Sequence, residues 1–156
     1  MNNRRVVGLL LIALVVAGKT TRAQDHHSDS KEIGVVHFPI TCENPSTQQD
    51  FNRAMALLHS FWYYRALKDF NEIRMREPKC AMAYWGIAMS YFHLLWEPPT
   101  SEEIDHAWTA LKNAKHVGAV TDRERMYIEA LESFYQDAGK TDHRSRLLAY
   151  EKAMER

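Results

Sequence analysis

Histidine and cysteine are the side chains in this sequence whose types could carry chemistry. The chain has eight histidines and two cysteines, but no HExxH sequence, no paired histidines at helical spacing and no Cys/His finger pattern. A histidine beside leucines, such as His59 or His93, is more often a hydrogen-bonded packing residue than a ligand. Folding could still bring distant histidines together, so the candidate metal ligands are His26, His37, His59 and His93.

The two cysteines favour a disulfide bond, because an even count is typical of exported proteins with bridges. Cys42 precedes the first predicted helix and Cys80 follows the second, and these points lie at the same end of an antiparallel helix pair. A Cys42–Cys80 bridge would stabilise the fold by on the order of 3–4 kcal/mol. The alternative is two buried thiols, and catalytic thiol chemistry is disfavoured because no CxxC motif is present.

Two further groups of side chains could form binding sites. Trp62 and Trp96 fall in predicted turns, where they could line an aromatic groove, although core packing explains most aromatic residues of the chain. Two short clusters of arginines, at 122–125 and 142–146, are interleaved with acidic residues, and this pattern indicates salt-bridged helix starts. The alternative is that they form a binding site for a carboxylate or phosphate group. Their arginines are Arg123, Arg125, Arg144 and Arg146.

Six helices are predicted to position these groups. Capping-box pairs mark three starts: Ser46 with Gln49, Thr100 with Glu103, and Thr121 with Glu124. Apolar β-branched residues and a proline predict an extended segment at 35–42. The predicted helices cover residues 46–60, 63–76, 80–94, 101–117, 121–136 and 143–155.

Small and aromatic residues recur along the helices at repeat spacing. Ala54 and Leu57 stand 34 positions before Ala88 and Tyr91. The predicted packing positions are Ala54, Leu57, Ala66, Phe70, Pro78, Tyr84, Ile87, Ala88, Tyr91, Ala107, Leu111 and Ala114. This pattern resembles the tetratricopeptide repeat, although the second helix of the second unit comes seven residues late.

The strings HFPITC, FNRAMALLHSFWYYRAL and PKCAMAYWGIAMS are similar to those of exported bacterial tetratricopeptide-repeat proteins of unassigned function. The resemblance implies an all-α solenoid of about two to three helix pairs, with a concave groove that binds a peptide or protein. It carries over no catalytic residues. Members of that group continue with further repeats, so we expect the chain to be truncated at its C-terminus.

Residues 1–23 are typical of a secretory signal peptide. Arg4 and Arg5 precede an apolar run at 6–18, and small residues precede the expected cleavage point. The run is too short to span a bilayer comfortably, although an uncleaved anchor is the alternative. We therefore expect a periplasmic or extracellular protein without a stable membrane span, with a flexible or extended lead-in at 24–45 and the helical repeat domain at 46–156.

Cleavage after residue 23 would expose Gln24, Asp25 and His26 at the new N-terminus. An amine, two amides and the third-position imidazole can surround Cu(II) or Ni(II) in a square plane. Cyclisation of Gln24 would remove the amine. No other cofactor is expected.

The charge balance excludes one large class of function. Basic and acidic residues number 20 each, and the pI is about 7.1, so the charge balance does not suggest nucleic-acid binding, which usually needs a basic face. The favoured function is a protein- or peptide-binding scaffold with no catalytic activity of its own. The alternative is a metal- or small-molecule-binding helical domain, alone or as part of an enzyme, that uses histidines brought together by the fold.

Overall fold

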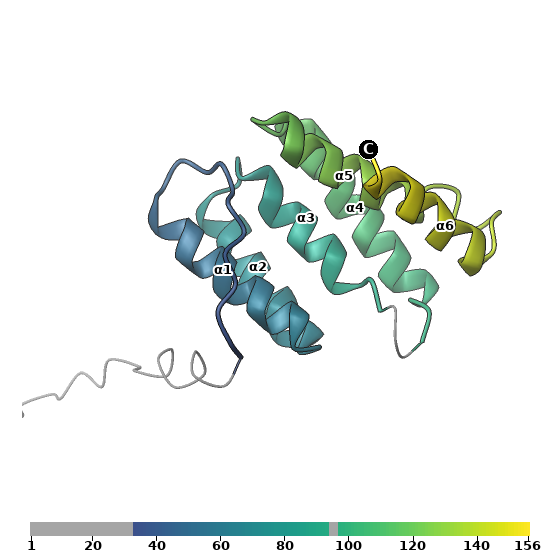
Figure 1. Cartoon of the computed structure of the whole chain (residues 1–156), viewed down its shortest axis with the longest axis horizontal. Coiled ribbons are helices and arrows are strands. Elements are labelled where there is room, and N and C mark those ends of the chain that lie inside the picture. The colour runs from purple at the N-terminus through teal and green to yellow at the C-terminus, as the bar shows by residue number, and fades with distance from the viewer. Residues whose placement is uncertain (1–32, 94–96) are drawn as a thin grey trace, which may run out of the picture.

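The computed structural model describes residues 33–93 and 97–156, which form six helices and no strand (Figure 1). The predicted signal peptide, the Gln24–His26 motif and Trp96 lie outside these residues. No helix in the described ranges is long and apolar enough to cross a membrane. The helices are α1 (Ser46–His59), α2 (Tyr63–Arg76), α3 (Ala81–Ser90), α4 (Ser101–Val117), α5 (Asp122–Tyr135) and α6 (His143–Met154).

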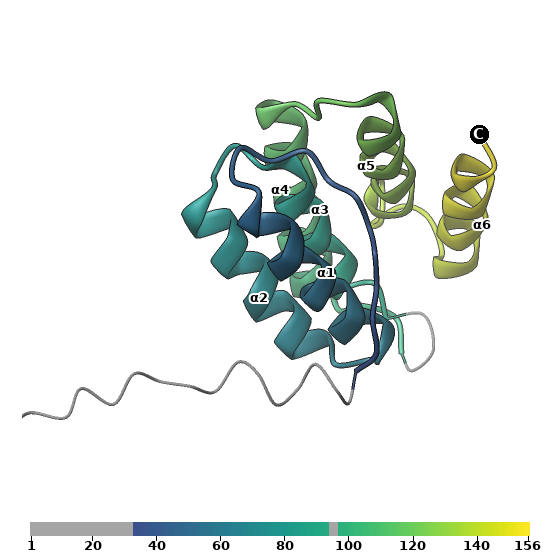
Figure 2. The same ribbon diagram turned by 60° about the vertical axis from the view of Figure 1, so that its left-hand side comes forward.

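The helices pack mainly against their neighbours in sequence, which confirms the all-α class. Each helix contacts the next, and α3 also contacts α1 and α5. Figure 2 shows the pairs α1–α2, α3–α4 and α5–α6 following one another across the molecule. Five of the six helices agree with the predicted ranges to within one residue at each end.

The predicted third helix was too long, because α3 ends at Ser90 rather than residue 94. The backbone N–H of Phe92 bonds to the carbonyl of Met89 at 3.0 Å, a tight turn that closes the helix. The turn buries the Phe92 ring, which lies 4.5 Å from the Phe134 ring and 4.8 Å from the Tyr150 ring between centroids. Burial of this aromatic ring accounts for the early end.

The helix starts follow the predicted capping chemistry in two of three cases. Both threonine capping boxes, at the starts of α4 and α5, are present. The Ser46–Gln49 box was wrong, because Pro45 already has helical dihedral angles and moves Ser46 inside the helix. The Asn44 side chain instead accepts the Ser46 N–H at 3.0 Å. Helix α6 also has a side-chain cap, which was not predicted: Asp142 accepts the Ser145 N–H at 3.1 Å.

The core runs continuously through the described helices. Among the residues at predicted packing positions, Tyr91 is half-buried and Pro78 is exposed after α2, while the other ten are buried. Helices α2 and α3 cross closely where Gly86 faces the fully buried Phe70 ring. The predicted disulfide is confirmed: Cys42 is bonded to Cys80, the residue that precedes α3, with 5.1 Å between their Cα atoms.

The buried Tyr135 predicts a loss of stability in alkali. Burial raises the pKa of its phenol well above the ordinary value, and the nearby Arg146 charge opposes that rise only in part. The unfolded chain releases this proton near pH 10, so the stability present below that pH falls as the pH rises above it. We expect Tyr135→Phe to make the free energy of unfolding less dependent on pH between 9 and 11.

Urea unfolding at a series of pH values measures this effect. At pH 7 the variant should lose about 1 kcal/mol, because the Tyr135 hydroxyl donates to the Ala88 carbonyl at 3.1 Å. Tyr64→Phe is the matched control, since Tyr64 is 81% exposed. Parallel pH curves for the Tyr135→Phe variant and the wild-type protein would contradict the prediction.

Candidate functional site

Residues 35–42, which we call the strap, run as an extended segment over α1 (Figures 1 and 2), and they also contact Trp85 of α3 and Glu124 of α5. The side chains alternate in exposure, as expected for an extended chain resting on a surface. Val36, Phe38, Ile40 and Cys42 are partly buried against the helices, whereas Val35, His37, Pro39 and Thr41 are exposed. The strap therefore presents every second side chain to the helices.

Two amide side chains one turn apart on α1 hold one edge of the strap backbone. Asn52 Oδ1 accepts the Phe38 N–H at 3.0 Å, and Gln48 Oε1 accepts the Ile40 N–H at 2.9 Å. Gln48 Nε2 donates to the Phe38 carbonyl at 2.8 Å and to Asn52 Oδ1 at 2.9 Å. Residues four apart on a helix thus match backbone groups two apart on an extended chain.

Two charged side chains at the start of α5 hold the opposite edge. Arg123 donates to the Pro39 carbonyl, and Glu124 Oε1 accepts the Thr41 N–H at 2.6 Å. Glu124 is only 1% exposed and is also the capping-box residue of α5, so its position is well fixed. Side chains therefore form hydrogen bonds to the backbone along both edges of the strap. In a β-sheet, neighbouring strands would make these bonds.

Phe38 occupies an aromatic socket, which we define as Phe51, Trp85 and Tyr127 from α1, α3 and α5. The ring centroids of these residues lie 5.8, 5.5 and 5.2 Å from that of Phe38. The Arg123 guanidinium carbon lies 5.1 Å from the Phe38 centroid, a cation–π distance. Trp85 Nε1 donates to the Tyr127 carbonyl at 3.2 Å, which ties two walls of the socket together.

The amide grip predicts a local weakening on substitution. Gln48→Ala leaves the Ile40 N–H and the Phe38 carbonyl without their partner, so we expect a loss of about 1–2 kcal/mol and faster hydrogen exchange at the Ile40 amide, while the Phe38 amide keeps its bond to Asn52 Oδ1. Exchange measured by NMR checks this. Gln49→Ala changes the neighbouring exposed glutamine and should leave the Ile40 amide protected. Unchanged protection in Gln48→Ala would show that the strap is held without this bond.

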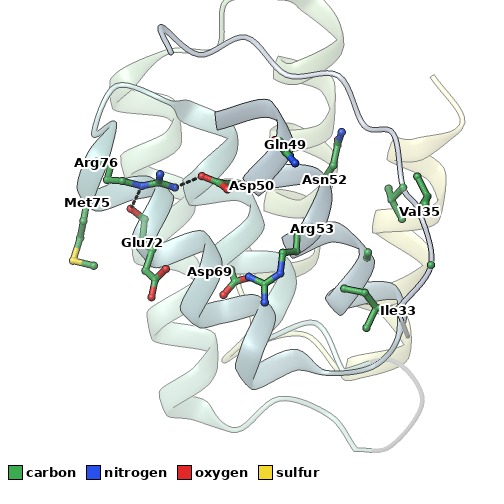
Figure 3. A pocket seen from close by; sticks show the side chains of 13 residues that line it. Ile33, Val35, Gln49, Asp50, Asn52, Arg53, Asp69, Glu72, Met75 and Arg76 are labelled. Atoms are coloured by element: carbon green, nitrogen blue, oxygen red, sulfur yellow. Dashed lines mark hydrogen bonds and ion pairs between the residues drawn. The ribbon is translucent and has the colours of Figure 1, made fainter. Parts of the chain in front are cut away.

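A second candidate site is a charged groove of about 800 Å³ between α1, α2 and the residues at the start of the strap (Figure 3). Arg53 pairs with Asp69 at 2.8 Å, and Arg76 pairs with Asp50 at 2.5 Å. These ion pairs link the two helices across the groove. Because the opposite charges are paired with each other, the groove is neither strongly positive nor strongly negative toward a ligand.

The three candidate metal ligands that the structure describes do not form a metal site. His37 is exposed on the strap, and His59 is exposed at the end of α1. His93 is half-buried after α3, where Nε2 lies 3.2 Å from the Ser90 carbonyl oxygen and the ring lies 4.8 Å from that of Tyr63. Within residues 33–93 and 97–156, no group of three or more His, Cys, Asp or Glu residues could hold a metal ion. His26 lies outside those ranges.

The first arginine cluster divides between two roles. Arg125 pairs with Asp122 as expected for a salt-bridged helix start, whereas Arg123 holds the strap.

Trp62 is 39% exposed in the turn between α1 and α2, and the Arg65 guanidinium lies over its ring, 5.1 Å from the centroid. Gln48, Asn52 and the Phe38 socket were not predicted from the sequence. The polar pair four residues apart, flanking Phe51, was the available signal.

The second arginine cluster surrounds the start of α6. Hydrogen bonds from Ser145 lower the pKa of the capping Asp142. Burial and then the Arg146 charge lower the pKa of His143. Arg146 is buried with its guanidinium 4.7 Å from the Phe134 centroid, while Arg144 is exposed. The cluster is therefore largely part of the packing of α6 on α5.

No family model, curated protein or solved structure matches the chain. The contacts around the strap grip a polypeptide backbone along both edges and enclose one aromatic side chain. They are suited to binding an extended peptide.

Proposed function

We propose that this protein is an exported helical scaffold that binds a polypeptide segment and has no catalytic activity of its own. The observation that carries the proposal is the strap, whose backbone is held by Gln48 and Asn52 on one edge and by Arg123 and Glu124 on the other. Side chains that contact backbone groups tolerate variation in the bound sequence. Such a surface needs no reactive group.

The proposal includes stacking of the helix pairs as in tetratricopeptide repeats. The contacts that α3 makes with both α1 and α5 support it, since the first helices of stacked pairs form one continuous face. The recurrence of small residues at the packing positions also supports it. The strap lies on this face, which is the place where a solenoid would bind an extended ligand.

Export is the second part of the proposal. The Cys42–Cys80 disulfide is consistent with an oxidising compartment, because such bonds are rare in the cytosol. The basic and apolar pattern of residues 1–23 gives the expected route. Together these features support a periplasmic or extracellular scaffold.

A small-molecule-binding domain is the second candidate function. The groove of about 800 Å³ favours it, because this volume is within the range of ligand pockets. The ion pairs across that groove make it a less specific binding site than the one formed by the side chains that hold the strap. A ligand there would have to satisfy both signs of charge.

Panning a random linear peptide library against the purified wild-type chain tests the scaffold proposal. The experiment has an oxidised arm and an arm with reducing agent, both containing EDTA. We expect selected peptides to bind at micromolar concentration in at least one arm, as measured by fluorescence anisotropy. Failure to select a peptide in either arm, together with a stoichiometric metal or small-molecule adduct by native mass spectrometry, would replace the scaffold with the alternative.

A further inference from the structure

We propose that the strap is a tethered ligand, which occupies the peptide-binding face of α1, α3 and α5 and competes with a segment of another polypeptide for the same place. This inference rests on the proposed scaffold function and identifies its ligand class. The ligand is an extended segment with an aromatic side chain for the socket and apolar side chains two residues to either side. The strap itself supplies Val36, Phe38 and Ile40 in this pattern.

The strap differs from an ordinary connecting segment in the side-chain contacts that its backbone receives. Four side chains on two helices are directed at the backbone of residues 38–41. Of the strap side chains, the socket holds only that of Phe38, which contacts its three aromatic rings and the Arg123 guanidinium. Backbone contacts supply affinity and the socket supplies specificity, as in recognition of an extended peptide by a separate chain.

Proline after the aromatic residue fits the same face. Pro39 has no N–H, and only its carbonyl is used, as the acceptor for Arg123. Its side chain points to solvent. A ligand with proline at this position leaves no unsatisfied donor and loses less conformational freedom on binding. The preferred ligand core is therefore apolar, any residue, aromatic, proline, apolar.

The tether gives the strap a large advantage over any free segment. Cys42 is covalently bonded to Cys80, and only residues 43–45 separate the strap from α1. A short tether acts as an effective concentration on the order of millimolar. A free ligand of micromolar intrinsic affinity therefore binds the oxidised wild-type protein weakly, and it binds more tightly when the strap is weakened.

A labelled synthetic peptide of residues 34–43, carrying Ser in place of Cys42, tests this competition. The protein is the full chain in three forms, namely oxidised wild type, Phe38→Ala and His37→Ala. We expect Phe38→Ala to bind the peptide at least tenfold more tightly than wild type by fluorescence anisotropy, because its socket is empty. The peptide should also raise the melting temperature of that variant. His37 points to solvent, so His37→Ala should behave as wild type.

Specificity is checked with the same peptide carrying Phe38→Ala, which should bind none of the three proteins. If the Phe38→Ala protein fails to fold, Cys42→Ser/Cys80→Ser replaces it, because there the strap and socket remain intact but the tether is loosened. This variant should also bind the labelled peptide more tightly than oxidised wild type. Equal binding to wild type and a folded variant, or no binding to a folded variant, overturns the tethered-ligand proposal.

The two proposals fail in different ways. If a library-selected peptide binds oxidised wild type and Phe38→Ala with equal affinity, the scaffold proposal stands and the competition by the strap is rejected. If neither the strap peptide nor any library peptide binds any form, both proposals are rejected. Displacement of a library-selected peptide by the strap peptide supports both.

Discussion

Replacing both cysteines, as in Cys42→Ser/Cys80→Ser, is expected to lower the free energy of unfolding by about 4 kcal/mol. The bridge spans 38 residues, and its loss frees the unfolded chain to sample many more conformations. The loss should also show locally, because the bridge attaches the end of the strap to the residue before α3. Urea unfolding at neutral pH measures the global effect, and hydrogen exchange at the Phe38, Ile40 and Thr41 amides measures the local one.

Reduced wild-type protein is the control for the serine side chains. Cys80 is 1% exposed, so a serine hydroxyl there adds a cost of its own, which the reduced protein does not carry. We expect reduced wild type to unfold at a lower urea concentration than oxidised protein but at a higher one than the double variant. If oxidised and reduced protein unfold together, the strap is held by its non-covalent contacts alone.

Gly86→Ala is expected to destabilise the fold by about 2–3 kcal/mol, against the usual preference for alanine in helices. A Cβ atom on residue 86 would lie 2.3 Å from Cδ1 of Phe70, whose ring is fully buried. The ring has no solvent to move into, so α2 and α3 must separate. Thermal unfolding followed by circular dichroism measures the loss.

The cause can be isolated with a matched control and a double-mutant cycle. Gly139→Ala meets nothing within 4 Å and should change stability by less than about 1 kcal/mol. In the Phe70→Leu background the smaller side chain makes room, so Gly86→Ala should cost less there than in wild type. Additive losses in the double variant would rule out the contact with Phe70 as the cause.

The helices could be predicted because their signals are local. Thr100 with Glu103 and Thr121 with Glu124 mark helix starts within four residues of sequence, and the structure contains both boxes. The Cys42–Cys80 bridge was also predictable, since the arrangement of the first two helices places its ends together. The end of α3 was not predictable by the same means, because it depends on where Phe92 packs.

The grip on the strap could not be predicted because its contacts join distant parts of the chain. Glu124 is 83 residues from Thr41, and Arg123 is 84 residues from Pro39. Both charged residues fit a local explanation, as a capping partner and as a member of a salt-bridged helix start. Only the packing of α5 beside α3 reveals that they also hold an extended segment.

The strap also imposes an order on assembly during synthesis. Its residues are made before any of the helices that hold them, and Cys80 follows Cys42 by 38 residues. Glu124 follows Thr41 by 83 residues, which corresponds to about 4–17 s at ordinary rates of elongation. The covalent partner is thus available well before the socket is complete. In a chain that folds as it emerges into an oxidising compartment, early oxidation would hold the strap beside α3 until α5 packs against it.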